Sequence, residues 1–158
     1  MKNTAMQAKT HILFSLICVL FYIDYYNVQN PIIFTILVLF TTLAVDIDES
    51  NSKLGKHFKP FSSIIQWILG HRGLLHSLLI PLLFYIILSF LNQQEIAIAI
   101  ALGYISHIVM DILTPQGVYI FYPFKLKING PIKVGSWLEK LLAILLLIAI
   151  AVKLLFVL

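Results

Sequence analysis

Five apolar stretches dominate the pattern of hydrophobic and polar positions along the 158-residue chain. They run over residues 12–26, from about 27 or 31 to 45, 73–91, 96–113 and 138–158. A helix that crosses the hydrocarbon layer needs about 20 apolar residues, with a tolerated range of about 17–25. The shorter stretches can be accommodated by a thinner bilayer or by a polar site buried in protein. Because the stretches lack period-two alternation, we expect helices rather than strands.

The composition supports a membrane location. Hydrophobic residues make up 60% of the chain and charged residues 11%, whereas an average soluble domain has about 25% charged residues. This excludes an ordinary soluble domain, a disordered chain and a basic nucleic-acid module. Cys18 is the single cysteine, so no intrachain disulfide forms. The first stretch lacks a small-residue cleavage site after it, which favours a retained helix over a signal peptide. We therefore expect an all-α, polytopic membrane protein of about five transmembrane helices, with residues 1–158 forming one domain.

The positive charges indicate the orientation. The short connections 27–30 and 92–95 hold no Lys or Arg, whereas the segments 46–72 and 114–137 are long and basic. Five helices place the N-terminus and both basic segments on one side, together with ten of the eleven positive residues. Cytoplasmic loops carry the Lys and Arg excess, so we expect a cytoplasmic N-terminus. Lys153, the exception, and Asp24 belong to the opposite interface. We also expect a short interfacial helix over residues 61–69, and aromatic side chains at headgroup level over residues 118–124.

Ionisable residues near the apolar stretches form four clusters. They are the Thr10–His11 pair, the Asp46–Asp48 run, the His71–His76 segment and the His107–Asp111 segment. With alternating helix directions, all four clusters fall at the cytoplasmic face. His107 and Asp111 are four residues apart, so they share one side of a helix. Asp46 and Asp48 would share a side if the chain is extended there.

Intramembrane His and Asp residues are costly, so they indicate a functional site. Imidazole and carboxylate ligands suit a divalent metal, zinc first, with manganese or iron as alternatives. One ion, or two ions bridged by an Asp, would fit the number of ligands. The candidate metal ligands are His11, Asp46, Asp48, His71, His76, His107 and Asp111.

Other residues could support the reaction. Arg72 would bind an anionic substrate oxygen, and Asp48 is a second candidate for a catalytic role. Ser77, Ser106 and Thr114 could hydrogen-bond to the ligands.

Two motifs carry a resemblance to a known family. They are His-Arg-Gly-x-x-His-Ser over residues 71–77 and Ser-His-x-x-x-Asp over residues 106–111. With these motifs, the chain resembles the YdjM/YbcI group of bacterial inner-membrane proteins over nearly its whole length. The resemblance implies a membrane-bound metal-dependent hydrolase in the bacterial inner membrane. Val45 and Leu75 depart from the Pro and Thr that the group often has there. The group is also distantly similar to zinc-dependent phospholipases C, an analogy of fold only.

The expected function is hydrolysis, by water that a metal ion activates, of a phosphoester or lipid-like substrate. Membrane lipids are the expected partners, with a phospholipid or small phosphoester as substrate and no nucleic acid. Two alternatives stay open. One is a metal-ion or proton-coupled transporter, although such sites tend to lie at the bilayer midplane within inverted repeats, and no repeat is visible. The other is a non-catalytic membrane regulator with a structural metal, which closed coordination would favour.

Overall fold

The computed structural model describes residues 8–48, 74–124 and 126–157, and within them the chain is mostly helical. The expected interfacial helix over residues 61–69 lies outside the described residues. The described helices are α1 (Ala8–Tyr25), α2 (Pro31–Ala44), α4 (Leu79–Phe90), α5 (Gln94–Ile112) and α6 (Trp137–Val157). Two short 3-10 turns, η1 (Val45–Asp48) and η2 (Leu74–His76), follow α2 and precede α4. Two short strands, β1 (Val118–Tyr119) and β2 (Lys127–Ile128), lie between α5 and α6.

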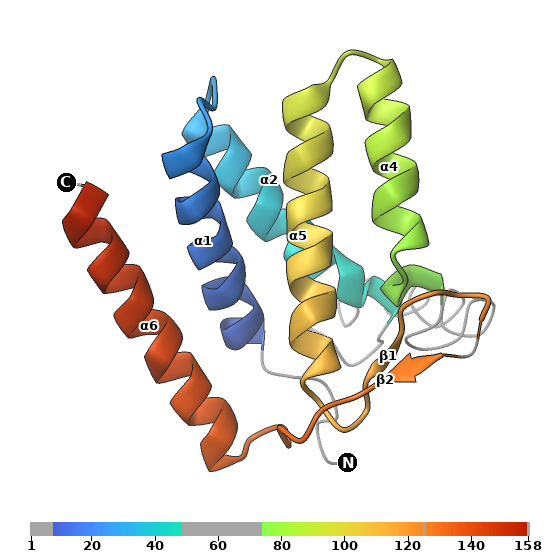
Figure 1. The fold of residues 1–158 in the computed structure, drawn as a ribbon, viewed down its shortest axis with the longest axis vertical. Helices are drawn as coiled ribbons and strands as arrows, with labels where there is room; N and C mark the ends of the chain where they lie inside the picture. Colours follow the sequence, from blue (N-terminus) through green and yellow to red (C-terminus); the bar gives the residue numbers. More distant parts are fainter. Residues whose placement is uncertain (1–7, 49–73, 125, 158) are drawn as a thin grey trace.

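Helix α5 lies at the centre of the bundle and packs against α1, α2 and α4. Helix α6 packs against α1 at the outer edge, and α4 stands at the other edge (Figure 1). Successive helices run in opposite directions, so the starts of α1, α4 and α6 and the ends of α2 and α5 lie at one end of the bundle (Figure 1). We call this the site end. The alternation expected from the sequence therefore brings the polar clusters of the described residues to one end.

Local sequence signals set the connections at the opposite end. The Asn30 side chain accepts a hydrogen bond of 3.1 Å from the Ile33 N–H, and Pro31 follows it as the first residue of α2. Proline suits this position because its missing N–H has no partner in the first turn anyway. Asn92 adopts a φ of 59° in the tight turn between α4 and α5, a conformation that Asn tolerates. Both connections thus match the short turns predicted there.

The third apolar stretch is not one continuous helix. It opens with the 3-10 turn η2, and α4 begins only at Leu79. Pro81 lies in the first turn of α4, where proline is tolerated, whereas in the interior of a longer helix it would remove a hydrogen bond. The expected helix from residue 73 to 91 is therefore shorter, and His76 lies in the turn before it.

A two-stranded antiparallel ladder corrects the expectation of a purely helical chain. Val118 pairs with Ile128, and Tyr119 pairs with Lys127. The Leu78 N–H donates a 3.0 Å hydrogen bond to the Ile120 carbonyl, so this hairpin is tied to the segment before α4. Val118 is completely buried. The start of the segment thus packs into the core of the site end, whereas its aromatic residues Phe121, Tyr122 and Phe124 are exposed.

At the opposite end, Asp24 of α1 forms an ion pair with Lys153 of α6. The Lys153 ammonium also lies 4.8 Å from the centre of the Phe21 ring. The two charged residues that the sequence assigned to the opposite interface are thus partners, and they connect the outer helix α6 to α1.

By length and apolar composition, α1 and α5 qualify as membrane-crossing helices among the described residues. Helix α4 and the segment 31–47 are also apolar but shorter. This agrees with the short spans expected from the sequence.

Helices α2 and α5 approach most closely at Gly103. A Cβ atom there would clash with the Val38 carbonyl oxygen and lie 3.0 Å from the Thr41 Cβ. Backbone atoms cannot move aside as a flexible side chain can, so the two helices pack this closely only because residue 103 has no side chain.

We expect Gly103→Ala to destabilise the protein by about 1–3 kcal/mol, the usual cost of overpacking. The substitution would otherwise gain about 1 kcal/mol of helix propensity, so the sign of the change identifies the effect that dominates. Thermal unfolding in detergent measures it, with Ala151→Val on the exposed side of α6 as the control. A more stable Gly103→Ala protein would contradict the close approach.

Candidate metal centre

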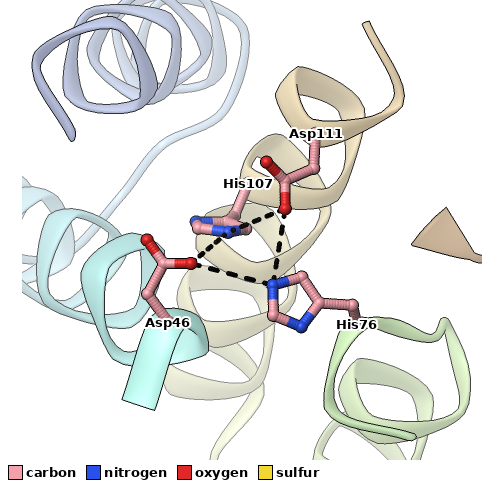
Figure 2. A group of neighbouring side chains, drawn as sticks. All are labelled: Asp46, His76, His107 and Asp111. Atoms are coloured by element: carbon pink, nitrogen blue, oxygen red, sulfur yellow. Dashed lines mark ion pairs between the residues drawn. The ribbon is translucent and has the colours of Figure 1, made fainter. Parts of the chain in front are cut away.

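Four side chains from three parts of the chain converge at the site end. Asp46 comes from η1, His76 from η2, and His107 and Asp111 from α5 (Figure 2). Each offers one ligand atom, and the four atoms all lie within 4.8 Å of one another. We call these four residues the metal-site cluster. The cluster lies between elements that are far apart in sequence, so only the folded bundle assembles it.

The distances within the cluster fit a central ion. The His107 Nε2 atom lies 3.4 Å from Asp46 Oδ1 and 3.6 Å from Asp111 Oδ2. The His76 Nε2 atom lies 3.4 Å from Asp111 Oδ2 and 3.8 Å from Asp46 Oδ1. Ligands of a tetrahedral zinc ion stand about 3.4 Å apart, given bonds of about 2.0–2.2 Å. The four nitrogen–oxygen distances of 3.4–3.8 Å are thus close to the spacing between ligands of one ion.

Burial makes a bound cation favourable. His76, His107 and Asp111 are at most 1% exposed, and Asp46 is 14% exposed. Burying two carboxylates near each other is costly in a low-dielectric interior unless their charge is compensated. A divalent cation between them provides that compensation. Among the four residues, Asp46 alone keeps contact with the surroundings, so any open side of the cluster lies there.

A backbone carbonyl fixes the orientation of the His107 ring. Its Nδ1 lies 2.7 Å from the Thr42 carbonyl oxygen. A carbonyl only accepts hydrogen bonds, so Nδ1 carries the proton and donates. In the neutral ring the lone pair is then on Nε2, the atom that faces Asp46 and Asp111. A hydrogen bond on the far nitrogen is the usual support of a ligating histidine.

A buried group of hydroxyls lies beside His107. Ser15 Oγ is 2.8 Å from Thr42 Oγ1 and 2.7 Å from Ser106 Oγ, and it donates to the His11 carbonyl at 2.8 Å. These hydrogen bonds join α1, α2 and α5 directly behind the imidazole ring. Ser106 was a predicted supporting residue, whereas Ser15 and Thr42 were missed. A hydroxyl within an apolar helix was the available signal, together with the four-residue spacing between His11 and Ser15.

His11 lies next to the cluster and faces the Asp111 oxygen that the other two histidines do not face. Its Nε2 atom is 3.7 Å from Asp111 Oδ1, whereas His76 and His107 face Oδ2. The His11 ring stacks on the His107 ring, with 4.2 Å between centroids and 18° between planes. The two oxygens of one buried carboxylate therefore face different imidazoles.

Ser77 and Thr114 support the backbone of the candidate ligands. The Ser77 hydroxyl donates a 2.7 Å hydrogen bond to the Leu74 carbonyl and closes the turn that carries His76. The Thr114 hydroxyl donates to the Asp111 carbonyl at 2.8 Å and accepts from the Gly117 N–H at 3.3 Å.

The remaining predicted residues have mixed outcomes. Asp48 is the last residue of η1, so the chain after α2 is a 3-10 turn, and the extended conformation that would put Asp46 and Asp48 on one side is not present there. His71 and Arg72 lie outside the described residues.

Glu139 is a buried carboxylate that the sequence reading missed. It is 3% exposed and accepts hydrogen bonds from the Gly135 N–H at 2.6 Å and the Thr10 hydroxyl at 3.4 Å. Thr10 precedes His11, so Glu139 connects the start of α6 to the helix turn that carries His11. The available signal was an acidic residue at the start of an apolar helix.

Comparison with known proteins identifies the family. The family model described as YdjM inner membrane protein matches residues 6–158. The chain belongs to this family. The inner membrane protein YdjM of Escherichia coli (strain K12) is 31% identical over 165 aligned positions, which cover 90% of this chain and 80% of the relative. The same figures hold for YdjM of Shigella flexneri. The uncharacterized protein YvsG of Bacillus subtilis (strain 168) is 29% identical over 139 residues, which cover 86% of each chain. No solved structure matches the chain.

Membership in the YdjM family confirms the inner-membrane location expected from the sequence. It also confirms the resemblance carried by the motifs at residues 71–77 and 106–111. The apolar helices and the buried His and Asp residues therefore belong to a membrane protein, and the cost of burying the cluster applies to a bundle surrounded by lipid.

We expect Asp111→Ala to abolish stoichiometric zinc binding, because both of its oxygens face imidazole nitrogens. The loss of affinity should exceed the roughly 10–100-fold that follows removal of a supporting group. Mass spectrometry of metals bound to the purified protein measures this. Asp24→Ala removes a carboxylate at the opposite end and is the matched control. Unchanged zinc content in Asp111→Ala would remove this residue from the ligand set.

Zinc binding should weaken as the pH falls from about 8 to about 5. Histidine ligands bind metal only in the deprotonated form, so protons compete with zinc and are released when it binds. The affinity for zinc therefore rises with pH over this range. Equilibrium dialysis at several pH values tests it, and a pH-independent affinity would argue against imidazole ligands.

Proposed function

We propose that this YdjM-family protein is a membrane-embedded, metal-dependent hydrolase. The observation that carries the proposal is the convergence of the four cluster residues, whose ligand atoms all lie within 4.8 Å of one another. Two imidazoles and two carboxylates suit zinc best, with manganese or iron as alternatives. A bound divalent ion would supply Lewis-acid chemistry and would lower the pKa of water toward about 7.

The residues of the chain prepare the site for this chemistry. The Thr42 carbonyl holds His107 in the tautomer that exposes Nε2. Asp46 is the one partly exposed member of the cluster, so substrate would approach on its side. From the sequence, Arg72 is the candidate for binding the anionic oxygen of the substrate, and Asp48, which follows Asp46 in the same turn, is a second catalytic candidate. A phosphoester is the substrate class that such a cation and a buried metal site fit best.

A second ion is part of this proposal. Asp111 Oδ1 faces His11 while Oδ2 faces the other two histidines, an arrangement suited to a carboxylate that bridges two ions about 3.5–4 Å apart. The metal-site cluster would hold the first ion, and His11 with Asp111 Oδ1 would hold the second.

The proposed topology has five transmembrane helices with the N-terminus and the site end in the cytoplasm. The alternating helix directions support it, as does the sequence pattern, which assigns ten of the eleven positive residues to the N-terminus and the two basic segments. The substrate would then come from the cytoplasmic leaflet or the cytoplasm.

A non-catalytic protein with a structural metal is the second candidate. The observation in its favour is that the cluster offers four protein ligands, which would close the coordination of a tetrahedral ion. Structural zinc sites are closed, whereas catalytic sites keep one position for water or substrate. Activity and stability of the same protein separate the two functions.

We expect zinc-loaded protein to hydrolyse at least one member of a panel of phosphomonoesters, phosphodiesters and phospholipids. His107→Ala serves as the blank, and Asp24→Ala as the variant that keeps activity. Removing zinc with a chelator should abolish turnover, because the ion polarises the substrate. A protein that binds zinc stoichiometrically, loses stability without it and hydrolyses nothing would be the structural alternative.

The topology is tested by cysteine labelling in a Cys18→Ala background. A cysteine at Asn92, in the turn between α4 and α5, should react with a membrane-impermeant reagent from the periplasmic side. A cysteine at Asn129, just after β2, should react only once the membrane is opened. The reverse pattern would place the N-terminus outside.

A further inference from the structure

An apolar groove runs beside the bundle core between α1, α4 and α5. Its cavity has a volume of about 510 Å³, within the roughly 300–1,000 Å³ of typical ligand sites. Nine residues line it, and all of them are aliphatic or aromatic. Helix α4 packs on α5, and the groove lies between these two helices on the side that faces α1. Helix α1 contributes only Tyr22 to its lining. Leu82 and Ile105 line the groove yet are 55% and 42% exposed, so the groove opens to the outside of the bundle.

The groove follows the helix axes away from the site end. On the α4 side its lining extends from Leu78 to Tyr85, and on the α5 side from Ile105 to Ile98. Seven residues of helix correspond to about 10 Å. Leu78 follows His76, a member of the metal-site cluster, by two residues. One end of the groove is therefore close in sequence to the cluster, and the other end lies toward the opposite face of the bundle.

The surroundings determine what can fill such a groove. The outward residues of α4 next to it are large and apolar, with Leu79, Leu83 and Phe84 each 45–51% exposed. In an inner-membrane protein this surface faces hydrocarbon. A narrow apolar groove that opens to hydrocarbon and runs along the helices has the shape and polarity of a lipid acyl chain.

We propose that this groove binds one acyl chain of the lipid substrate, with the head group directed toward the metal-site cluster. The inference rests on the proposed function and narrows it, because it makes the substrate a membrane lipid rather than a water-soluble phosphoester. The lining residues between Leu78 and Tyr85 and those between Ile98 and Ile105 contact the acyl chain from opposite sides over about 10 Å.

Ala101→Phe is the variant that tests the groove. Ala101 lines it from α5, so a phenyl ring there fills space that the acyl chain would occupy. Ala101 lies six residues before His107, and the cluster receives no atoms from it. Ala151→Phe makes the same change on the exposed side of α6 and is the matched control. Leu82→Trp, at the open side of the groove, is a second variant in case Ala101→Phe does not fold.

The experiment uses full-length, zinc-loaded protein in detergent with a phosphatidic acid that carries a photoreactive diazirine on one acyl chain. After illumination, peptide mapping should place the label on the groove residues of α4 and α5. Unlabelled phosphatidic acid should compete, whereas glycerol 3-phosphate should not. Ala101→Phe should reduce the labelling about tenfold, because the phenyl ring occupies the space of the acyl chain; this corresponds to about 1.4 kcal/mol of binding free energy. Ala151→Phe should label like the parent protein.

Three results would overturn the inference. The first is label spread evenly over the outer faces of α4 and α6, which indicates ordinary surrounding lipid. The second is labelling that Ala101→Phe and Leu82→Trp leave unchanged while both retain zinc. The third is a groove that cross-links to a second copy of the chain, which makes it an interface between copies.

The test separates this inference from the proposed function. Specific groove labelling in a zinc-bound protein that hydrolyses neither lipids nor water-soluble phosphoesters supports the acyl-chain site and overturns the hydrolase. Hydrolysis of water-soluble phosphoesters without groove labelling supports the hydrolase and overturns the acyl-chain site.

Discussion

The structure depends on the burial of one carboxylate. Asp111 is completely buried near the end of the central helix α5, and nitrogen atoms of three histidines lie within 3.7 Å of its oxygens. A charge in this position costs several kcal/mol without compensation. The protein therefore brings imidazole partners to it from α1 and η2 as well as from α5 itself, and these partners fix how the ends of the surrounding helices meet. The helices pack apolar faces elsewhere, but their relative positions at the site end follow from this requirement.

Buried hydrogen bonds make that arrangement specific. Thr42 contributes its carbonyl to His107 and its hydroxyl to Ser15, so one residue of α2 touches both α5 and α1. Gly103 lets α2 approach α5 closely enough for the first contact. In a lipid-surrounded bundle the hydrophobic effect does not drive helices together, so close packing and interhelical hydrogen bonds determine the pairing. The same contacts that hold the helices together also orient the candidate ligand, which links the fold to the chemistry proposed for the site.

The sequence predicted the helices, and it indicated which ionisable residues are costly to bury in a membrane protein. The helix ends at Tyr25, Ala44 and Ile112 fall within one residue of the predicted ends, because an apolar run surrounded by polar connections is a strong local signal. Asp46, His76, His107 and Asp111 could be singled out because ionisable residues are rare beside apolar helices. The short β1–β2 ladder could not be predicted, since two residues per strand leave no periodic pattern. The support that His107 receives from Thr42 was equally hidden, because a backbone carbonyl has no sequence signature.

By itself, then, the sequence determined a helical inner-membrane protein, its family and the residues from which a metal site could be built. Only the tertiary structure decided which of these residues meet. It grouped Asp46, His76, His107 and Asp111 within 4.8 Å, and it placed His11 on the other oxygen of Asp111. It also opened the apolar groove between α1, α4 and α5. The physical reason is that hydrophobicity and helix periodicity are properties of neighbouring residues, whereas ligand geometry and groove shape depend on the distance between helices, which long-range packing sets.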